Sequence, residues 1–119
     1  MRVRALALLF VFFSSAQAAD TDTLCATVFT YLSEEARSKG MGSSGFDEAD
    51  TRAQNAHLAN DPGEDRQRYA ISVIDGAQGL REGLANGSIT NDAIVATATS
   101  CNSRYYATEQ TSQPRIAPR

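Results

Sequence analysis

The sequence predicts an all-α protein, a compact bundle of about four helices whose first and last members are joined by a disulfide between Cys25 and Cys101. Apolar residues recur at spacings of three and four in several segments, as on one face of a helix. No segment alternates apolar and polar residues over the length of a strand. Glycine and proline turn signals separate the periodic segments, so each segment is expected to form one helix.

The first 18 residues have the order of a secretory signal peptide. Arg2 and Arg4 precede an apolar run over residues 5–13, and Ala16 and Ala18 then flank a single residue, as at a signal cleavage site. These nine apolar residues rise only about 14 Å as a helix, whereas a membrane span needs roughly 20 residues. The pattern therefore favours a cleaved leader over a membrane anchor.

Cleavage after Ala18 divides the chain into three parts. We expect a signal peptide over 1–18, a single helical domain over 19–109 and a flexible C-terminal tail over 110–119, which contains two prolines. Such a domain lies in the periplasm or is secreted. Ten arginines against one lysine are typical of a GC-rich bacterial genome and favour the periplasm, although a eukaryotic secretory route stays open.

The charge of the predicted mature chain is acidic. Removing Arg2 and Arg4 leaves nine basic residues against 14 acidic residues, for a formal net charge of −5. An acidic chain has no electrostatic attraction for phosphate backbones or anionic lipids. Nucleic acids and membrane surfaces are therefore disfavoured as partners, and no stable membrane insertion is expected after cleavage.

The first helix of the domain is expected over residues 23–39, with Asp20, Thr21 or Asp22 as its N-cap and Gly40 as its stop. Its apolar residues form one stripe, which includes a cysteine: Cys25, Val28, Phe29, Leu32 and Ala36. Three glycines within residues 40–45 then predict a loop.

A second, weaker helix is expected over residues 46–60. Apart from Phe46, one side of it carries only the small residues Ala49, Ala53 and Ala56. Small side chains bury little apolar area, so we expect this helix to be peripheral or mobile. The sequence Asp61-Pro62-Gly63 then predicts a turn.

The third helix is expected just after this turn, with Glu64 and Asp65 at the positive end of its dipole. Its apolar period is the clearest in the chain: Tyr69, Ala70, Val73, Ile74, Ala77, Leu80 and Leu84. Gly76, Gly79 and Gly83 each cost it up to about 1 kcal/mol relative to alanine, so we expect a neighbouring helix to approach closely there.

The fourth helix follows a left-handed stop at Asn86-Gly87, with Thr90 as its cap. Ile89 and Ile94 fall at the positions of a hydrophobic staple, in which residues on either side of a helix start pack together. One face of this helix carries Ile94, Ala98, Cys101 and Tyr105.

Cys25 and Cys101 are the only cysteines, and each lies on the apolar stripe of its helix. In an oxidising compartment two such thiols are expected to pair. The bond closes a loop of about 75 residues, which is worth roughly 4.5 kcal/mol in the chain-entropy model. Catalytic dithiols usually lie close in sequence, so a structural disulfide is favoured over a redox-active pair.

No metal site and no cofactor are expected. His57 is the only histidine, with Asp61 four residues and Asp50 seven residues away, but zinc sites normally have three or four protein ligands. We therefore expect His57 to be a solvated surface residue. Asp47, Glu48 and Asp50 lack the spacing of a calcium loop and are interpreted as favourable charge at a helix start.

Enzyme motifs are also missing from the sequence. There is no Gly-x-Ser-x-Gly elbow, and the glycines at 76 and 79 lack the strand and the lysine of a phosphate-binding loop. A non-enzymatic protein that binds a protein partner is therefore favoured, for instance an immunity or inhibitor protein against a secreted toxin or a cell-wall enzyme. In general layout the chain is similar to small two-cysteine helical immunity proteins, although it carries no motif of such a family.

Tyr106 and Phe46 are the candidate partner-binding residues, because aromatic side chains are enriched at interfaces. Tyr105 and Tyr106 point to different sides of a helix, so one of the two is expected to be exposed. The alternative function is a periplasmic stress or acid-activated chaperone, because the 14 carboxylates lose charge at low pH while the basic groups stay positive.

Overall fold

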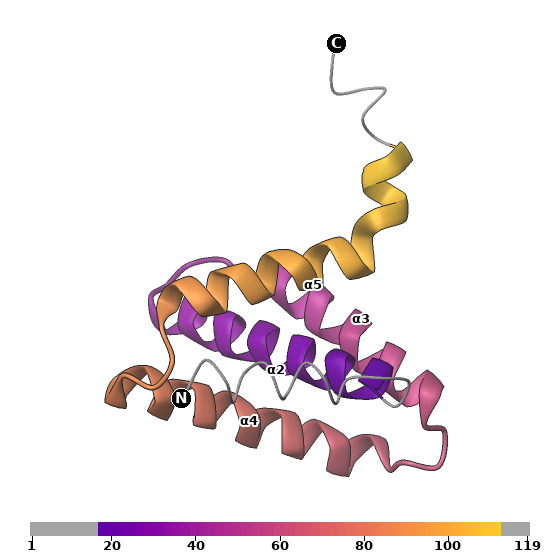
Figure 1. Ribbon diagram of the computed structural model, residues 1–119, viewed down its shortest axis with the longest axis horizontal. Helices are drawn as coiled ribbons and strands as arrows, with labels where there is room; N and C mark the ends of the chain where they lie inside the picture. Colours follow the sequence, from indigo (N-terminus) through magenta and orange to yellow (C-terminus); the bar gives the residue numbers. More distant parts are fainter. Residues whose placement is uncertain (1–16, 113–119) are drawn as a thin grey trace, which may run out of the picture.

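A computed structural model describes residues 17–112 of the chain and the side chains of residues 21–107. It contains helices α2 (Gln17–Ser38), α3 (Ser44–Asn60), α4 (Arg66–Asn86) and α5 (Asn91–Ser112), and no strand is present within the described part. The all-α prediction is confirmed. Helix α2 is central, with α4 along one side and α3 and α5 along the other (Figure 1).

Helix α2 begins earlier than the sequence predicted. It already includes Gln17, so the expected N-cap role of Asp20, Thr21 or Asp22 is wrong. Asp22 is instead fully buried inside the bundle, where its carboxylate accepts hydrogen bonds from Arg104 and Tyr105 of α5. A short polar residue before an apolar stripe has the signature of a cap, and only the fold reveals that this one points into the core.

The end of α2 lies where the sequence predicted it. Gly40 takes the left-handed conformation, with φ of 73°, which glycine adopts without strain. Its N–H donates to the Arg37 carbonyl, and the N–H of Met41 donates to the Ala36 carbonyl at 2.8 Å. These bonds satisfy carbonyl groups that the last helical turn would otherwise leave without partners.

Helix α3 is not peripheral, which corrects the expectation from its small side chains. Among all helix pairs, α2 and α3 contact each other most extensively. Ala49 and Ala53 are 3% and 0% exposed and belong to the main apolar cluster. Alanines let two helix backbones approach closely, so a helix with little apolar area of its own can still be central to the packing.

Helix α4 begins at a well-formed cap. The Asp65 carboxylate accepts from the backbone N–H groups of Gln67 and Arg68, at 2.8 and 3.0 Å. Its buried face includes Tyr69, Val73 and Ala77, as predicted, whereas Ile74 departs from the predicted stripe because it is 52% exposed.

The three glycines of α4 have different surroundings. A Cβ at Gly76 would lie 3.0 Å from Thr27 of α2, so this glycine does permit close approach of a helix. A Cβ at Gly83 would lie 2.5 Å from Ile89, which belongs to the turn after α4 and not to a neighbouring helix. A Cβ at Gly79 meets nothing within 4 Å, so the expected close approach is wrong there.

The turn from α4 to α5 follows the sequence signals closely. Gly87 is left-handed, with φ of 83°, and the Thr90 hydroxyl accepts from the N–H of Ala93 at 3.1 Å. Ile89 and Ile94 pack into the same apolar cluster, as the staple predicts.

The predicted apolar face of α5 faces the core. Ile94 and Cys101 are buried, and Ala98 and Tyr105 pack against the core.

Cys25 and Cys101 form the predicted disulfide, which joins α2 to α5 with 5.6 Å between the Cα atoms. Both sulfur-bearing residues belong to the main cluster, between α2, α3, α4 and α5. A second cluster lies towards the other end of the bundle and contains Val28, Tyr31, Ala77 and Ile94.

Most of the predicted leader, residues 1–16, and the last seven residues of the predicted tail, 113–119, lie outside the described residues. The first three residues of that tail, 110–112, continue α5 as helix (Figure 1). Across the part of the chain that the structure describes, no helix combines the length and the apolar character needed to span a membrane.

Candidate functional site

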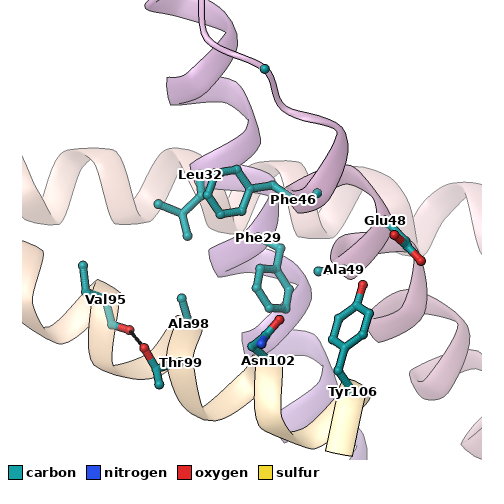
Figure 2. A pocket seen from close by; sticks show the side chains of 12 residues that line it. Phe29, Leu32, Phe46, Glu48, Ala49, Val95, Ala98, Thr99, Asn102 and Tyr106 are labelled. Atoms are coloured by element: carbon teal, nitrogen blue, oxygen red, sulfur yellow. Dashed lines mark hydrogen bonds between the residues drawn. The ribbon is translucent and has the colours of Figure 1, made fainter. Parts of the chain in front are cut away.

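An open groove of about 700 Å³ lies between α3 and α5, with α2 at its base (Figure 2). Most of its lining is aromatic or aliphatic. The lining residues are Phe29 and Leu32 of α2, Gly42 in the loop, Gly45, Phe46, Glu48 and Ala49 of α3, and Val95, Ala98, Thr99, Asn102 and Tyr106 of α5.

The two partner-binding residues chosen from the sequence, Phe46 and Tyr106, line this same groove from opposite sides. They are 60 positions apart in the chain, and no sequence signal connects them. Phe46 is half-buried and packs against the main apolar cluster from the first turn of α3. The fold therefore brings both candidates into one apolar surface.

The tyrosine pair of α5 differs from the prediction, because neither ring is fully exposed. The hydroxyl of Tyr105 donates to buried Asp22, and its burial raises the pKa of this phenol well above the usual range. The ring of Tyr106 lies under the guanidinium of Arg52, 4.1 Å from its centroid. Arg52 also donates to the Tyr105 carbonyl at 3.0 Å, which positions this end of the groove.

Several groove residues were not identified from the sequence. Phe29 and Leu32 were predicted only as core residues, although one edge of each faces the groove (Figure 2). Val95 is 60% exposed and lies off the predicted apolar stripe of its helix. An apolar residue outside such a stripe was the one available signal, and it is a weak signal because scattered exposed apolar residues are common.

The groove lining has little chemistry that a catalyst needs. Glu48 is its one charged residue, and it pairs with Arg52 at 3.2 Å. The Thr99 hydroxyl donates to the Val95 carbonyl of its own helix. A reacting group would need an activated nucleophile or a positioned acid and base, whereas apolar lining with aromatic edges suits the burial of another apolar surface.

The disulfide is shielded from solvent, since Cys25 is 1% and Cys101 is 3% exposed. A smaller hollow of about 480 Å³ lies beside it, lined in part by Leu24, Ala96 and Arg104. Redox-active cysteines need access to their substrates. The burial of both residues therefore agrees with a structural bond.

His57 is buried, so the expectation of a solvated surface histidine is wrong. Its ring stacks on Tyr69, with centroids 4.0 Å apart and planes at 3°. Its Nδ1 lies 3.3 Å from the Thr23 hydroxyl, and its Nε2 lies 2.5 Å from a carboxylate oxygen of Glu64. Helical spacing predicted Asp50 and Asp61 as the possible neighbours of the ring. Glu64 was not predicted, because it reaches His57 only through the turn between α3 and α4.

The acidic residues at the start of α3 attach this helix to α2. Asp47 lies in the first turn of α3, as expected, and accepts from Ser33 and Arg37 of α2 and from Ser43. The Ser33 bond is the main reason that the pKa of Asp47 lies below its usual value. Asp50 accepts from the Thr30 hydroxyl at 2.7 Å, and burial raises its pKa.

Comparison of the chain with protein-family models, with curated proteins and with solved structures gives no match.

Proposed function

We propose that this chain is an exported, non-enzymatic protein whose groove between α3 and α5 binds an apolar segment of a protein partner. An inhibitor or immunity-type protein against a secreted toxin or a cell-wall enzyme is the favoured example. The observation that carries this proposal is the groove itself, which exposes aromatic and aliphatic side chains from three helices. The leader-like N-terminus and the Cys25–Cys101 disulfide support export to the periplasm or beyond, because disulfides persist in oxidising compartments.

A protein segment suits the groove better than a small polar metabolite. Small-molecule sites place several polar groups so that they converge on the ligand. Here the lining offers Glu48, Thr99 and Asn102 beside a majority of apolar residues. Open apolar surfaces with aromatic edges are typical of the centre of a protein interface, where a few bulky side chains supply most of the binding energy.

Charge indicates the kind of segment that binds. Glu48 is the one charged residue of the lining, and the sequence as a whole has a formal net charge of −3. Complementary potentials favour the association of opposite charges. The expected partner segment therefore presents bulky apolar side chains to Phe46 and Tyr106, with a lysine or arginine that shares the exposed Glu48 carboxylate with Arg52.

A matched pair of surface variants tests the proposal. Val95 lies in the groove and is 60% exposed, whereas Ile71 of α4 lies outside it and is 55% exposed. Both are β-branched residues of helix interiors, so Val95→Asp and Ile71→Asp impose similar costs on folding. The oxidised wild-type protein and both variants are immobilised and exposed to envelope and secreted fractions, and bound proteins are identified by mass spectrometry.

One stoichiometric partner that is retained by wild type and Ile71→Asp but lost by Val95→Asp supports the proposal. A partner retained equally by both variants would show that the groove is not its binding surface. Capture of many unrelated proteins only at acidic pH would instead support the alternative function, an acid-activated chaperone.

A further inference from the structure

His57, Asp61 and Glu64 bring one imidazole nitrogen and two carboxylate groups together where α3 turns into α4. One ligand atom from each lies within 4.8 Å of the other two. We propose that these three side chains bind a divalent transition-metal ion, for which Zn²⁺ is the best fit. This site is separate from the groove, so the inference is independent of the proposed function.

The backbone holds the three donors close together before any ion binds. Asp61 follows α3 directly, and its N–H donates to the His57 carbonyl at 3.0 Å. Pro62 and Gly63 then turn the chain, and the N–H of Glu64 donates to the Asp61 carbonyl at 3.1 Å. Donor atoms about 2.0–2.2 Å from a zinc ion lie roughly 3–4 Å apart, so only small side-chain movements separate this arrangement from coordination.

The imidazole is held in an orientation that suits a ligand. Its Nε2 lies beside the Glu64 carboxylate, while Nδ1 lies 3.3 Å from the Thr23 hydroxyl and the ring stacks on Tyr69. Histidines that bind metals usually have their second nitrogen hydrogen-bonded in this way. A threonine hydroxyl both donates and accepts hydrogen bonds, so it can accept one from Nδ1–H when Nε2 binds the ion.

The exposure of the three residues allows an ion to enter. The side chain of His57 is 11% exposed and that of Glu64 is 30% exposed, while Asp61 lies at the surface. An ion entering from solvent separates Nε2 from the Glu64 oxygen and takes the place of their hydrogen bond. Since Asp61 and Glu64 are on the solvent side, they can adjust to the ion around the fixed imidazole.

The donor set selects the class of metal. Imidazole suits Zn²⁺ and its neighbours, whereas Ca²⁺ and Mg²⁺ prefer oxygen ligands alone. Three protein ligands leave at least one coordination position of a zinc ion for water. The rival interpretation is that His57 and Glu64 form only a structural pair that fixes the start of α4 on α3.

Titration calorimetry of the oxidised full chain with ZnCl₂ distinguishes the two interpretations. We expect one Zn²⁺ per chain and much weaker binding of CaCl₂. Asp61→Asn changes an exposed side chain with little consequence for folding, and we expect it to weaken zinc binding at least tenfold. Glu64→Gln and His57→Gln should do the same, and Thr23→Val should weaken binding by roughly tenfold because it removes the support of Nδ1.

The control variant is Glu82→Gln, which removes an exposed carboxylate on α4, outside the proposed site. Its affinity should match that of wild type. The absorption spectrum of bound Co²⁺ depends on its ligands. A wild-type spectrum typical of nitrogen coordination, which changes in His57→Gln, would confirm the imidazole as a donor. Absence of stoichiometric zinc binding, equal affinity in Asp61→Asn, or equally tight binding of Ca²⁺ would overturn the proposal.

Discussion

Helices α3 and α5 both pack against α2, but they are held to it in different ways (Figure 1). The contact with α3 is extensive and continuous. Buried alanines bring the two backbones together, and Thr30 and Ser33 of α2 donate hydrogen bonds to Asp50 and Asp47 of α3. Because the attachment is spread over several turns, no single side chain decides it.

The attachment of α5 to α2 is concentrated at a few points. The two helices contact each other less extensively, and their strongest links are the Cys25–Cys101 bond and the group formed by Asp22, Arg104 and Tyr105. The groove lies between the helix that is held broadly and the helix that is held locally. We therefore expect its width to change when either of these two links is removed.

Removal of the disulfide should have the largest effect on this arrangement. The bond joins residues 76 positions apart, and losing such a cross-link costs roughly 4.5 kcal/mol in the chain-entropy model. We expect the Cys25→Ala/Cys101→Ala protein to unfold at a lower urea concentration. In hydrogen exchange its α5 amides should lose protection first, while the α2–α3 pair stays protected longest.

The control for this prediction is the wild-type protein with and without a reductant, since reduction should reproduce the behaviour of the double variant. Equal loss of protection in α3 and α5 would contradict the difference in attachment, because it would show that the bundle opens as a single unit.

Arg104→Met should have the second largest effect. Asp22 is 0% exposed, and its second oxygen, Oδ2, has no hydrogen-bond partner within the described residues. Arg104 donates to the first oxygen at 2.9 Å, and that bond is the main reason that the pKa of the guanidinium is raised. Methionine retains much of the side-chain length but leaves a buried carboxylate without its cation, which we expect to lower the free energy of unfolding by about 2–3 kcal/mol.

Urea denaturation at neutral pH measures this loss. Arg66→Met is a suitable control, because Arg66 is exposed and its guanidinium donates to the side-chain oxygen of Asn55, a neutral group. Tyr105→Phe should cost less than Arg104→Met, about 1–2 kcal/mol, because it removes a neutral donor. An Arg104→Met protein as stable as wild type would mean that Asp22 does not need its cation.

The same contrast explains which features were predictable from the sequence. Gly40, Gly87 and Thr90 were identified correctly, because the backbone angle or capping bond that each supplies depends on its immediate neighbours. The disulfide was also predictable, since two cysteines on apolar stripes, in a chain with a predicted secretory leader, have few alternatives to pairing.

Features that depend on which helices meet were not predictable. His57 was expected in solvent because the sequence offered too few further ligands for a metal site. Its burial comes from contacts with Thr23 and Tyr69 on two other helices. Asp22 was likewise predicted as a cap, because its partners Arg104 and Tyr105 lie on another helix. Phe46 and Tyr106 were selected singly, and the groove that contains both exists only because α3 and α5 pack beside each other on α2.

The smallest predicted effect compares the two hydroxyl bonds from α2 to α3. The pKa of Asp47 is lowered from 3.8, chiefly by the bond from Ser33, so the stability that this bond supplies is present above about pH 4 and is lost as pH falls through the lower folded-state pKa. The pKa of Asp50 is raised from 3.8 by burial, so Asp50 takes up its proton above that value and the folded state gains relative stability as it does so. Ser33→Ala and Thr30→Val should each lower the free energy of unfolding at pH 7 by about 1 kcal/mol or less.

The two variants should differ in where their deficit relative to wild type closes on acidification. The deficit of Thr30→Val should shrink at a pH above 3.8, when Asp50 becomes protonated. The deficit of Ser33→Ala should shrink only below pH 3.8, when Asp47 becomes protonated. Urea denaturation of wild type and both variants at intervals between pH 7 and pH 3 measures both curves. If the two deficits close over the same pH range, Asp47 and Asp50 experience the same environment, and the α2–α3 contact is not divided into a solvated end and a buried end.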